Sequence, residues 1–140
     1  MYGPKDDSSK FVQFVIESLL RNEEKIKLTK GEQKRDFIFI KDVVEAYLKL
    51  LEVHDSLEDG FNEFEVGTGE SITIKELVVK IKILTGNTKT KLIFGALPYR
   101  ENEIMESKAD ITKLRGIGWS PKVSLEDGLK DTINWCRQNV

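Results

Sequence analysis

Cysteine and histidine are almost missing from this chain of 140 residues, which contains one of each. The single cysteine, Cys136, excludes an internal disulfide, and no CxxC or CxxH spacing is available for a zinc site. One histidine and one cysteine do not support a Ser–His–Asp or Cys–His nucleophilic set. No apolar run approaches the roughly 18 residues of a membrane span, and the first residues lack a signal-peptide pattern. The sequence therefore favours a soluble, cytoplasmic protein without a membrane partner.

Charge of one sign is also missing, because the formal net charge is only −2 and the basic residues are scattered along the chain. A nucleic-acid-binding domain usually carries a basic patch or stripe, so no nucleic-acid partner is expected. The hydrophobic content of 39% is sufficient for a core. A chain of this length predicts one domain.

The stretch Gly31–Val44 carries the clearest local pattern. Four consecutive apolar residues, Phe37–Ile40, predict a buried strand. Asp42 occupies a helix N-cap position with Glu45 three residues later, so a helix is expected to begin there.

Arg35 precedes this predicted strand, and its planar guanidinium suits a bidentate anion such as a phosphate. The spacing of Arg35 from nearby acidic residues favours an alternative to phosphate binding. Arg35 could form a surface ion pair with Asp36 or with Glu32.

The rest of the chain alternates between helical and strand patterns, which argues for an α/β layer arrangement. Helices are expected over Phe11–Leu20, after a Thr73–Glu76 capping box and after Ser124. The stripe of the last helix comprises Leu125, Leu129, Ile133, Cys136 and Val140. Strands are expected at 26–28, 61–66 and 91–94.

Gly67-Thr68-Gly69 follows one of these predicted strands and precedes a helix. It lacks the third glycine and the later acidic residue of a dinucleotide-binding fingerprint. A turn at a strand-to-helix corner is the better interpretation.

Five motifs occur in the order seen in extended short-chain dehydrogenases that act on nucleotide sugars. They are Met1-Tyr2-Gly3-Pro4, Gly31–Val44, Phe64–Gly69, Arg100–Asp110, and Gly118-Trp119-Ser120-Pro121 followed by Ser124–Leu129. The chain resembles the NAD-dependent epimerase/dehydratase enzymes. It looks closest to CDP-abequose synthases or to dTDP-4-keto-sugar reductases and epimerases. The resemblance covers the whole chain but only about the last two-fifths of such an enzyme.

The resemblance implies an α/β fold of mixed short strands and helices, the C-terminal substrate-binding portion of an NAD(P)-Rossmann enzyme. Residues 1–140 are accordingly expected to form a nucleotide-sugar-binding domain. The N-terminal NAD-binding part, with its Gly-rich loop and Tyr-x-x-x-Lys pair, belongs upstream of Met1 and is absent from the chain.

The resemblance also implies roles for particular residues. Arg35 and Arg100 match the two arginines that contact the nucleotide diphosphate, and Glu103 matches the acid that binds a ribose hydroxyl. Leu28 and Thr29 belong to the segment that matches the strand beside the base. No catalytic residue and no metal ligand are expected in this chain.

The expected function is binding of the diphosphate of a nucleotide sugar, as part of an epimerase, dehydratase or reductase. NAD or NADP is expected in the full-length enzyme, and no tightly bound cofactor in this chain, which should catalyse no hydride transfer. The chain is expected to partner the missing N-terminal part and to self-associate through its exposed apolar surface. The alternative is a stand-alone, non-catalytic module that binds nucleotide sugars or another protein.

Overall fold

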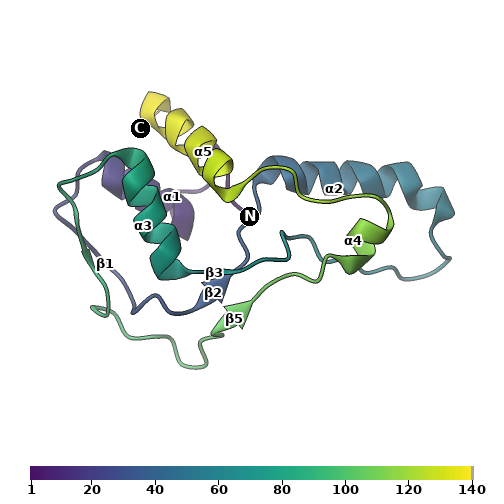
Figure 1. Cartoon of the computed structure of the whole chain (residues 1–140), viewed down its shortest axis with the longest axis horizontal. Helices are drawn as coiled ribbons and strands as arrows, with labels where there is room; N and C mark the ends of the chain where they lie inside the picture. The colour runs from purple at the N-terminus through teal and green to yellow at the C-terminus, as the bar shows by residue number, and fades with distance from the viewer. Residues whose placement is uncertain (140) are drawn as a thin grey trace.

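The computed structural model describes residues 1–139 (Figure 1). Its elements, in order, are α1 (Phe11–Leu20), β1 (Lys25–Lys27), β2 (Lys34–Arg35), α2 (Ile40–Val53), the 3₁₀ turn η1 (His54–Ser56), β3 (Ile72–Thr73), α3 (Ile74–Thr85), β4 (Lys91–Ile93), β5 (Glu106–Ser107), α4 (Thr112–Gly116) and α5 (Leu125–Asn139). No helix among the described residues is long and apolar enough to cross a membrane.

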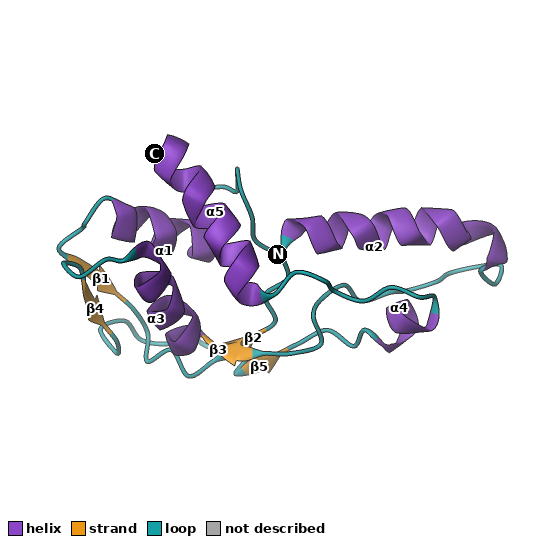
Figure 2. Cartoon of the chain, turned by 45° about the horizontal axis from the view of Figure 1, so that its top comes forward, coloured by secondary structure: helices purple, strands orange, loops and turns teal. Residues whose placement is uncertain are grey.

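The strands form two small sheets. β1 pairs in parallel with β4, while β2 lies in the middle of a second sheet, antiparallel to β3 and parallel to β5. Helices α1, α3 and α5 gather at one end of the molecule, and α2 with α4 extends from the other, with the second sheet between them (Figure 2). This arrangement of short strands and helices confirms the α/β class.

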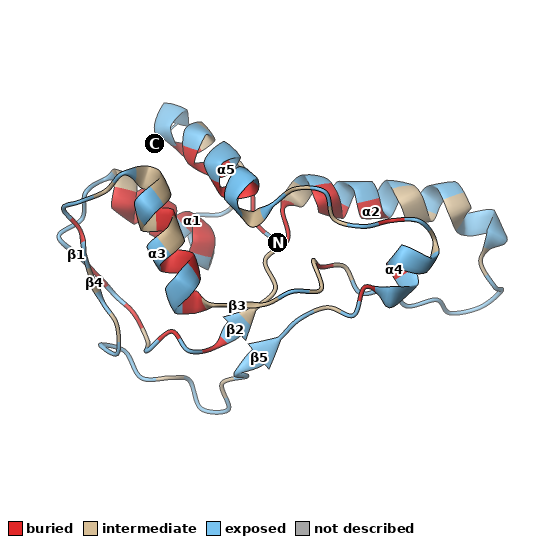
Figure 3. Ribbon diagram, viewed as in Figure 1, coloured by how far each residue is buried: buried red, intermediate tan, exposed pale blue. Residues whose placement is uncertain are grey.

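The larger core lies among α1, α3 and α5, where the buried faces of the three helices meet (Figure 3). The helix α1 is buried on more than one side, as its broad apolar pattern predicts. Gly128 lets α5 approach the first residues closely, because a Cβ there would collide with the Tyr2 hydroxyl and the Phe39 ring. The larger core therefore joins α5 to Tyr2 and Phe39.

A smaller core lies between α2 and α4. Its buried members are Ile38, Val43, Ala46, Ile111, Leu114 and Trp119. The opposite side of α2 carries large apolar side chains that are exposed, and we call it the α2 outer face. It comprises Val44, Tyr47, Leu48 and Leu51, which are 49–69% exposed. Nothing within residues 1–139 covers this surface.

The predicted helix signals at Thr73 and Ser124 are confirmed. The Thr73 hydroxyl accepts the Glu76 N–H and the Glu76 carboxylate accepts the Thr73 N–H, which completes the capping box. The Asp127 N–H donates to the Ser124 hydroxyl at the start of α5. The predicted stripe of α5 is buried at Leu129, Ile133 and Cys136 and partly buried at Leu125, while Val140 lies outside the described residues.

The predicted strand Phe37–Ile40 is wrong. The strand β2 ends at Arg35, and only Phe39 takes part in an isolated parallel bridge, with Tyr2. Ile40 already begins α2, whose N-cap is Phe39 rather than Asp42. The Asp42 carboxylate instead accepts the backbone N–H groups of residues 122 and 123, both at 3.0 Å.

The predicted strand over residues 61–66 is also wrong, because this segment has no ladder partner within the described residues. Phe61 is 91% exposed, while Phe64 and Val66 are partly buried against the smaller core. An extended segment becomes a strand only when a neighbouring backbone satisfies its N–H and C=O groups. The alternation of apolar residues was therefore not sufficient to define a strand at 61–66.

Candidate functional site

A cavity of about 500 Å³ lies between the segment 27–37 and the loop 94–105, which we call the covering loop. Its lining residues are Phe11, Phe14, Lys27, Leu28, Thr29, Gln33, Arg35, Phe37, Ile74, Leu97, Pro98, Arg100 and Glu103. All five site residues that the sequence predicts, Leu28, Thr29, Arg35, Arg100 and Glu103, are among them. The volume lies within the usual range for a small-molecule site.

Backbone hydrogen bonds hold the covering loop against the chain that follows β1. The Gly95 N–H donates to the Thr29 carbonyl at 3.1 Å, and the Leu97 N–H donates to the Leu28 carbonyl at 3.0 Å. The Leu28 N–H in turn donates to the Ile93 carbonyl at 3.0 Å. Leu28 is buried and lines the cavity, and its backbone binds both Ile93 and Leu97.

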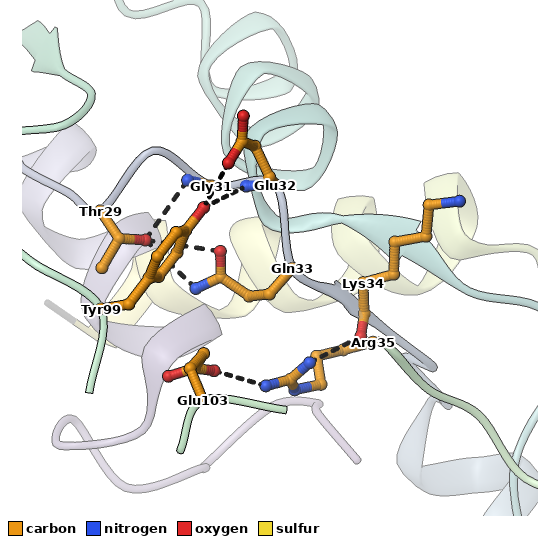
Figure 4. A network of polar contacts seen from close by, with 8 residues as sticks. All are labelled: Thr29, Gly31, Glu32, Gln33, Lys34, Arg35, Tyr99 and Glu103. Atoms are coloured by element: carbon orange, nitrogen blue, oxygen red, sulfur yellow. Dashed lines mark hydrogen bonds and ion pairs between the residues drawn. The ribbon is translucent and has the colours of Figure 1, made fainter. Parts of the chain in front are cut away.

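Tyr99 provides a third attachment of the covering loop (Figure 4). Its hydroxyl accepts the Glu32 backbone N–H at 3.2 Å and donates to the Glu32 carboxylate at 3.0 Å. Desolvation raises the pKa of the Tyr99 hydroxyl, and the nearby carboxylates of Glu32 and Glu103 add to this effect. The phenol therefore keeps its proton and remains a donor to Glu32 at neutral pH.

Thr29 and Gln33 interact across the turn at Gly31 (Figure 4). The Gln33 carboxamide donates to the Thr29 hydroxyl at 3.1 Å, and the Gly31 N–H donates to the same oxygen at 3.3 Å. Gly31 has φ +76°, and its Cα lies against the Lys75 backbone, so a side chain would be strained and crowded there. The turn thus brings Thr29 and Arg35 to the same cavity.

Arg35 and Glu103 form an ion pair inside the cavity, with Nη2 and Oε1 2.6 Å apart (Figure 4). A second guanidinium nitrogen donates to the Lys34 carbonyl at 2.7 Å. The two side chains are 28% and 17% exposed. The alternative pairing of Arg35 with Asp36 or Glu32 is wrong, because the acid that it meets belongs to the covering loop.

Arg100 and Glu103 are brought together by a tight turn. The Glu103 N–H donates to the Arg100 carbonyl at 3.1 Å, and Asn102 adopts a left-handed φ of 62°. Asparagine tolerates this conformation better than most residues. Arg100 is exposed, and within residues 1–139 its guanidinium has no hydrogen bond or ion pair. It is therefore free to meet an anion in the cavity.

Asp36 fixes the far end of β2, next to Arg35. Its carboxylate accepts the Thr68 N–H and hydroxyl, the Gly69 N–H at 2.9 Å and the Ala109 N–H at 3.3 Å. The segment Gly67-Thr68-Gly69 is thus a turn, as the sequence favours, but residues 61–66 before it form no strand, and the Thr68 and Gly69 N–H groups bind the Asp36 carboxylate. These bonds hold Arg35 at the mouth of the cavity.

The cavity combines a cationic end with an apolar wall. Arg35 and Arg100 supply two guanidinium groups, and Phe11, Phe14 and Leu97 supply apolar surface. This pairing suits a ligand that has a phosphate group at one end and a flat, apolar group at the other. Phe11, Phe14 and Gln33 were missed by the sequence analysis. The sequence did contain a signal for Phe11 and Phe14. The helix α1 has more apolar residues than one packed face needs, so some of them were available to line a cavity.

The described residues show no group arranged for catalysis at this cavity. No cluster of three or more His, Cys, Asp and Glu side chains within residues 1–139 is placed to hold a metal ion. Burial raises the pKa of the Cys136 thiol, and Cys136 lies in the larger core. The charged residues that line this cavity are Lys27, Arg35, Arg100 and Glu103.

Three comparisons place the chain among known proteins. A family model described as GDP-mannose 4,6 dehydratase matches residues 2–132. A CDP-abequose synthase of Salmonella muenchen is 42% identical over 134 residues, which cover 96% of this chain and 44% of that protein. A UDP-glucose 4-epimerase of Thermotoga maritima, solved with UDP-glucose, superposes with a TM-score of 0.80 and 37% sequence identity. The superposed part comprises 98% of this chain and 43% of the epimerase.

A UDP-glucose 4-epimerase of Thermus thermophilus, solved with NAD, superposes with a TM-score of 0.81 and 25% sequence identity. The superposed part comprises 99% of this chain and 44% of the epimerase. The chain therefore spans less than half the length of each of these three relatives. The chain belongs to the family of the GDP-mannose 4,6 dehydratase model, and it is similar to the C-terminal part of extended short-chain dehydrogenases that include nucleotide-sugar epimerases.

Proposed function

We propose that this chain is the nucleotide-sugar-binding part of an NAD(P)-dependent epimerase, dehydratase or reductase. The observation that carries the proposal is that one cavity brings together Leu28, Thr29, Arg35, Arg100 and Glu103, which are separated by up to 75 residues of sequence. In this proposal the two arginines hold the diphosphate and Glu103 accepts a hydrogen bond from a ribose hydroxyl. The base lies near Leu28 and Thr29, against the apolar wall.

The composition of the cavity wall supports this assignment. Arg35 and Arg100 line the same cavity as Thr29 and Leu28, and the Gln33 carboxamide holds the Thr29 hydroxyl at 3.1 Å. A planar guanidinium binds phosphate oxygens in a fixed fork, whereas an aromatic or aliphatic wall accepts the face of a base without reading its edge. The cavity would hold the nucleotide and leave the sugar at its open end.

The hydride chemistry would belong to the rest of the enzyme. NAD or NADP would take and return a hydride at the sugar, and this chain would orient the substrate. Residues 1–140 contain no Tyr-x-x-x-Lys pair, since Asp6, Leu51 and Glu103 stand four residues after the three tyrosines. A cytoplasmic location and a role in the synthesis of polysaccharide sugars remain predictions.

The first test is a calorimetric titration of the 140-residue chain with cytidine diphosphate, and separately with NAD. Cytidine diphosphate is the first choice because a relative of 42% identity is a CDP-abequose synthase. We expect measurable binding of the nucleoside diphosphate, and weak or no binding of NAD. A uridine and a guanosine diphosphate should be titrated alongside, because the base is not determined by the cavity. Tight NAD binding without nucleoside diphosphate binding would contradict the proposal.

We further propose that the α2 outer face packs against the remaining part of the full-length enzyme. Its support is the exposure of Tyr47, Leu48 and Leu51 together with the length of the relatives, of which this chain covers less than half. Large exposed apolar patches usually mark interfaces.

For the chain by itself, the prediction is self-association through the same face. Light scattering should show a mass that rises with concentration, and Leu48→Glu should reduce it, because a charge on the patch opposes its burial. Val79→Glu, at an exposed position of α3, is the matched control and should not reduce the mass. A monomeric mass at every concentration would rule the prediction out.

The competing function is a stand-alone module that binds a nucleotide sugar or a protein without taking part in catalysis. The same titration with the chain does not separate the two, because both bind the ligand. An activity assay after the N-terminal part of a full-length relative has been added to the chain separates the two functions. Recovery of epimerase, dehydratase or reductase activity supports the enzyme, and Arg35→Ala should then weaken it.

A further inference from the structure

Arg35 has an anionic partner before any ligand is bound. Its guanidinium lies 2.6 Å from the Glu103 carboxylate, and both side chains line the cavity. A phosphate that binds Arg35 must therefore compete with this carboxylate or bind beside it.

Glu103 cannot simply move away from the cavity. The covering loop is held by Gly95, Leu97 and Tyr99, and a further bond joins the Glu103 N–H to the Arg100 carbonyl. The carboxylate can rotate about its side-chain bonds, but its backbone stays beside the phosphate site. Any diphosphate at Arg35 and Arg100 consequently has a negative charge as a neighbour.

We propose that Glu103 is a specificity-determining residue that rejects free inorganic phosphates and selects diphosphates attached to a ribose. This inference rests on the proposed function and concerns the same cavity. A nucleoside diphosphate offers hydroxyl donors that satisfy the carboxylate when it leaves Arg35. Inorganic pyrophosphate lacks the ribose hydroxyls, so the carboxylate that it displaces from Arg35 remains as a like charge beside the phosphates.

The proposal explains why a carboxylate is placed against the phosphate-binding arginine, where a neutral side chain would bind a phosphate more readily. Arg35 alone would take any small phosphate of the cell, because charge and fork geometry do not distinguish one phosphate from another. Discrimination by a built-in repulsive element is a common route to specificity.

The test compares three probes by calorimetric titration of the 140-residue chain: cytidine diphosphate, 2′,3′-dideoxycytidine diphosphate and inorganic pyrophosphate. We expect the wild-type chain to prefer cytidine diphosphate strongly over the other two. In Glu103→Gln, pyrophosphate should bind about fivefold tighter, the upper end for a part-exposed ion pair. Cytidine diphosphate should not bind tighter, because its charge-assisted ribose bond becomes neutral.

The dideoxy probe keeps the base and both phosphates, so it isolates the contribution of the ribose hydroxyls. The affinity ratio between cytidine diphosphate and its dideoxy form should fall in Glu103→Gln, as in a double-mutant cycle between the carboxylate and the hydroxyls. A role limited to folding would change all three affinities alike. The readout is therefore a change of preference, not a loss of binding.

Glu101→Gln is the matched control, since it removes the same charge from the same turn at an exposed residue that does not line the cavity. Its preferences should equal those of the wild type. If Glu103→Gln changes the three affinities by one common factor, the inference is overturned while the proposed function stands. If the wild-type chain binds no nucleoside diphosphate, both are overturned.

Discussion

Asp36→Ala is expected to destabilise the chain by about 3 kcal/mol, because it removes one carboxylate that accepts several hydrogen bonds at once. Those donors are the backbone N–H groups of Thr68, Gly69 and Ala109 and the Thr68 hydroxyl. They would be left without an acceptor at a turn whose hydrogen bonds are partly buried. The free energy of unfolding from urea titration, followed by circular dichroism, measures the loss.

The conservative variant Asp36→Asn should recover only part of this stability. An asparagine keeps one acceptor oxygen but places an N–H₂ group against backbone N–H donors, which repel it. Asp59→Ala is the control, because Asp59 is exposed and has no hydrogen bond or ion pair within residues 1–139. It should change stability by less than about 0.5 kcal/mol. Equal stabilities of Asp36→Ala and Asp59→Ala would show that the Asp36 contacts do not support the fold.

The elements that sequence analysis predicted correctly depend on local signals. The Thr73–Glu76 box and the left-handed Gly86 bound α3, and each acts within four residues of the chain. The α1 pattern also predicted a helix with more than one buried side. Such signals are readable because the atoms that satisfy one another lie close in sequence.

The strands predicted at 26–28 and 91–94 agree with β1 and β4 to within one residue, but two other strand predictions failed. The apolar run Phe37–Ile40 has high strand propensity, yet a strand is defined by its neighbour, and only Tyr2 lies beside Phe39. The helix α2 begins within the run, at Ile40, and buries Val43 and Ala46 in the smaller core. Strand propensity alone therefore overestimated the strands at 37–40 and 61–66.

The site residues predicted from the sequence line one cavity, but the contact between Arg35 and Glu103 was not predicted. Arg35 and Glu103 are 68 residues apart in sequence, and no spacing rule predicts that distance. Motif order suggested that Arg35, Arg100 and Glu103 serve one ligand, and the covering loop brings them to one cavity. Gln33 and Tyr99 were missed because each acts through a neighbour, Thr29 or Glu32, and carries no motif of its own.

Arg35→Ala is expected to weaken binding of cytidine diphosphate by about 3 kcal/mol, and Arg100→Ala by about 1.5 kcal/mol, the two ends of the range for hydrogen bonds to charged groups. Arg35 is held in place by Glu103 and by the Lys34 carbonyl, so it is ordered before the ligand arrives. Arg100 is exposed and must lose side-chain freedom on binding. Removing Arg35 also leaves Glu103 without its counter-ion beside the phosphates.

The unpaired Glu103 carboxylate in Arg35→Ala can be tested by also changing Glu103. In the double variant Arg35→Ala/Glu103→Gln the loss should be smaller than in Arg35→Ala alone, because the unpaired charge is gone. Arg35→Lys should recover only part of the affinity, since lysine keeps the charge but not the two-pronged geometry. Both comparisons use the same titration and therefore need no new assay.

Arg21→Ala is the control for these experiments, because Arg21 also pairs with a glutamate, Glu17, at 3.0 Å, but lies away from the cavity. It should change stability slightly and leave the affinity for cytidine diphosphate as it is. If Arg35→Ala and Arg100→Ala bind the ligand as tightly as Arg21→Ala does, the arginines serve only the fold. The cavity would then hold its ligand by the apolar wall, and the phosphate assignment made for both arginines would be wrong.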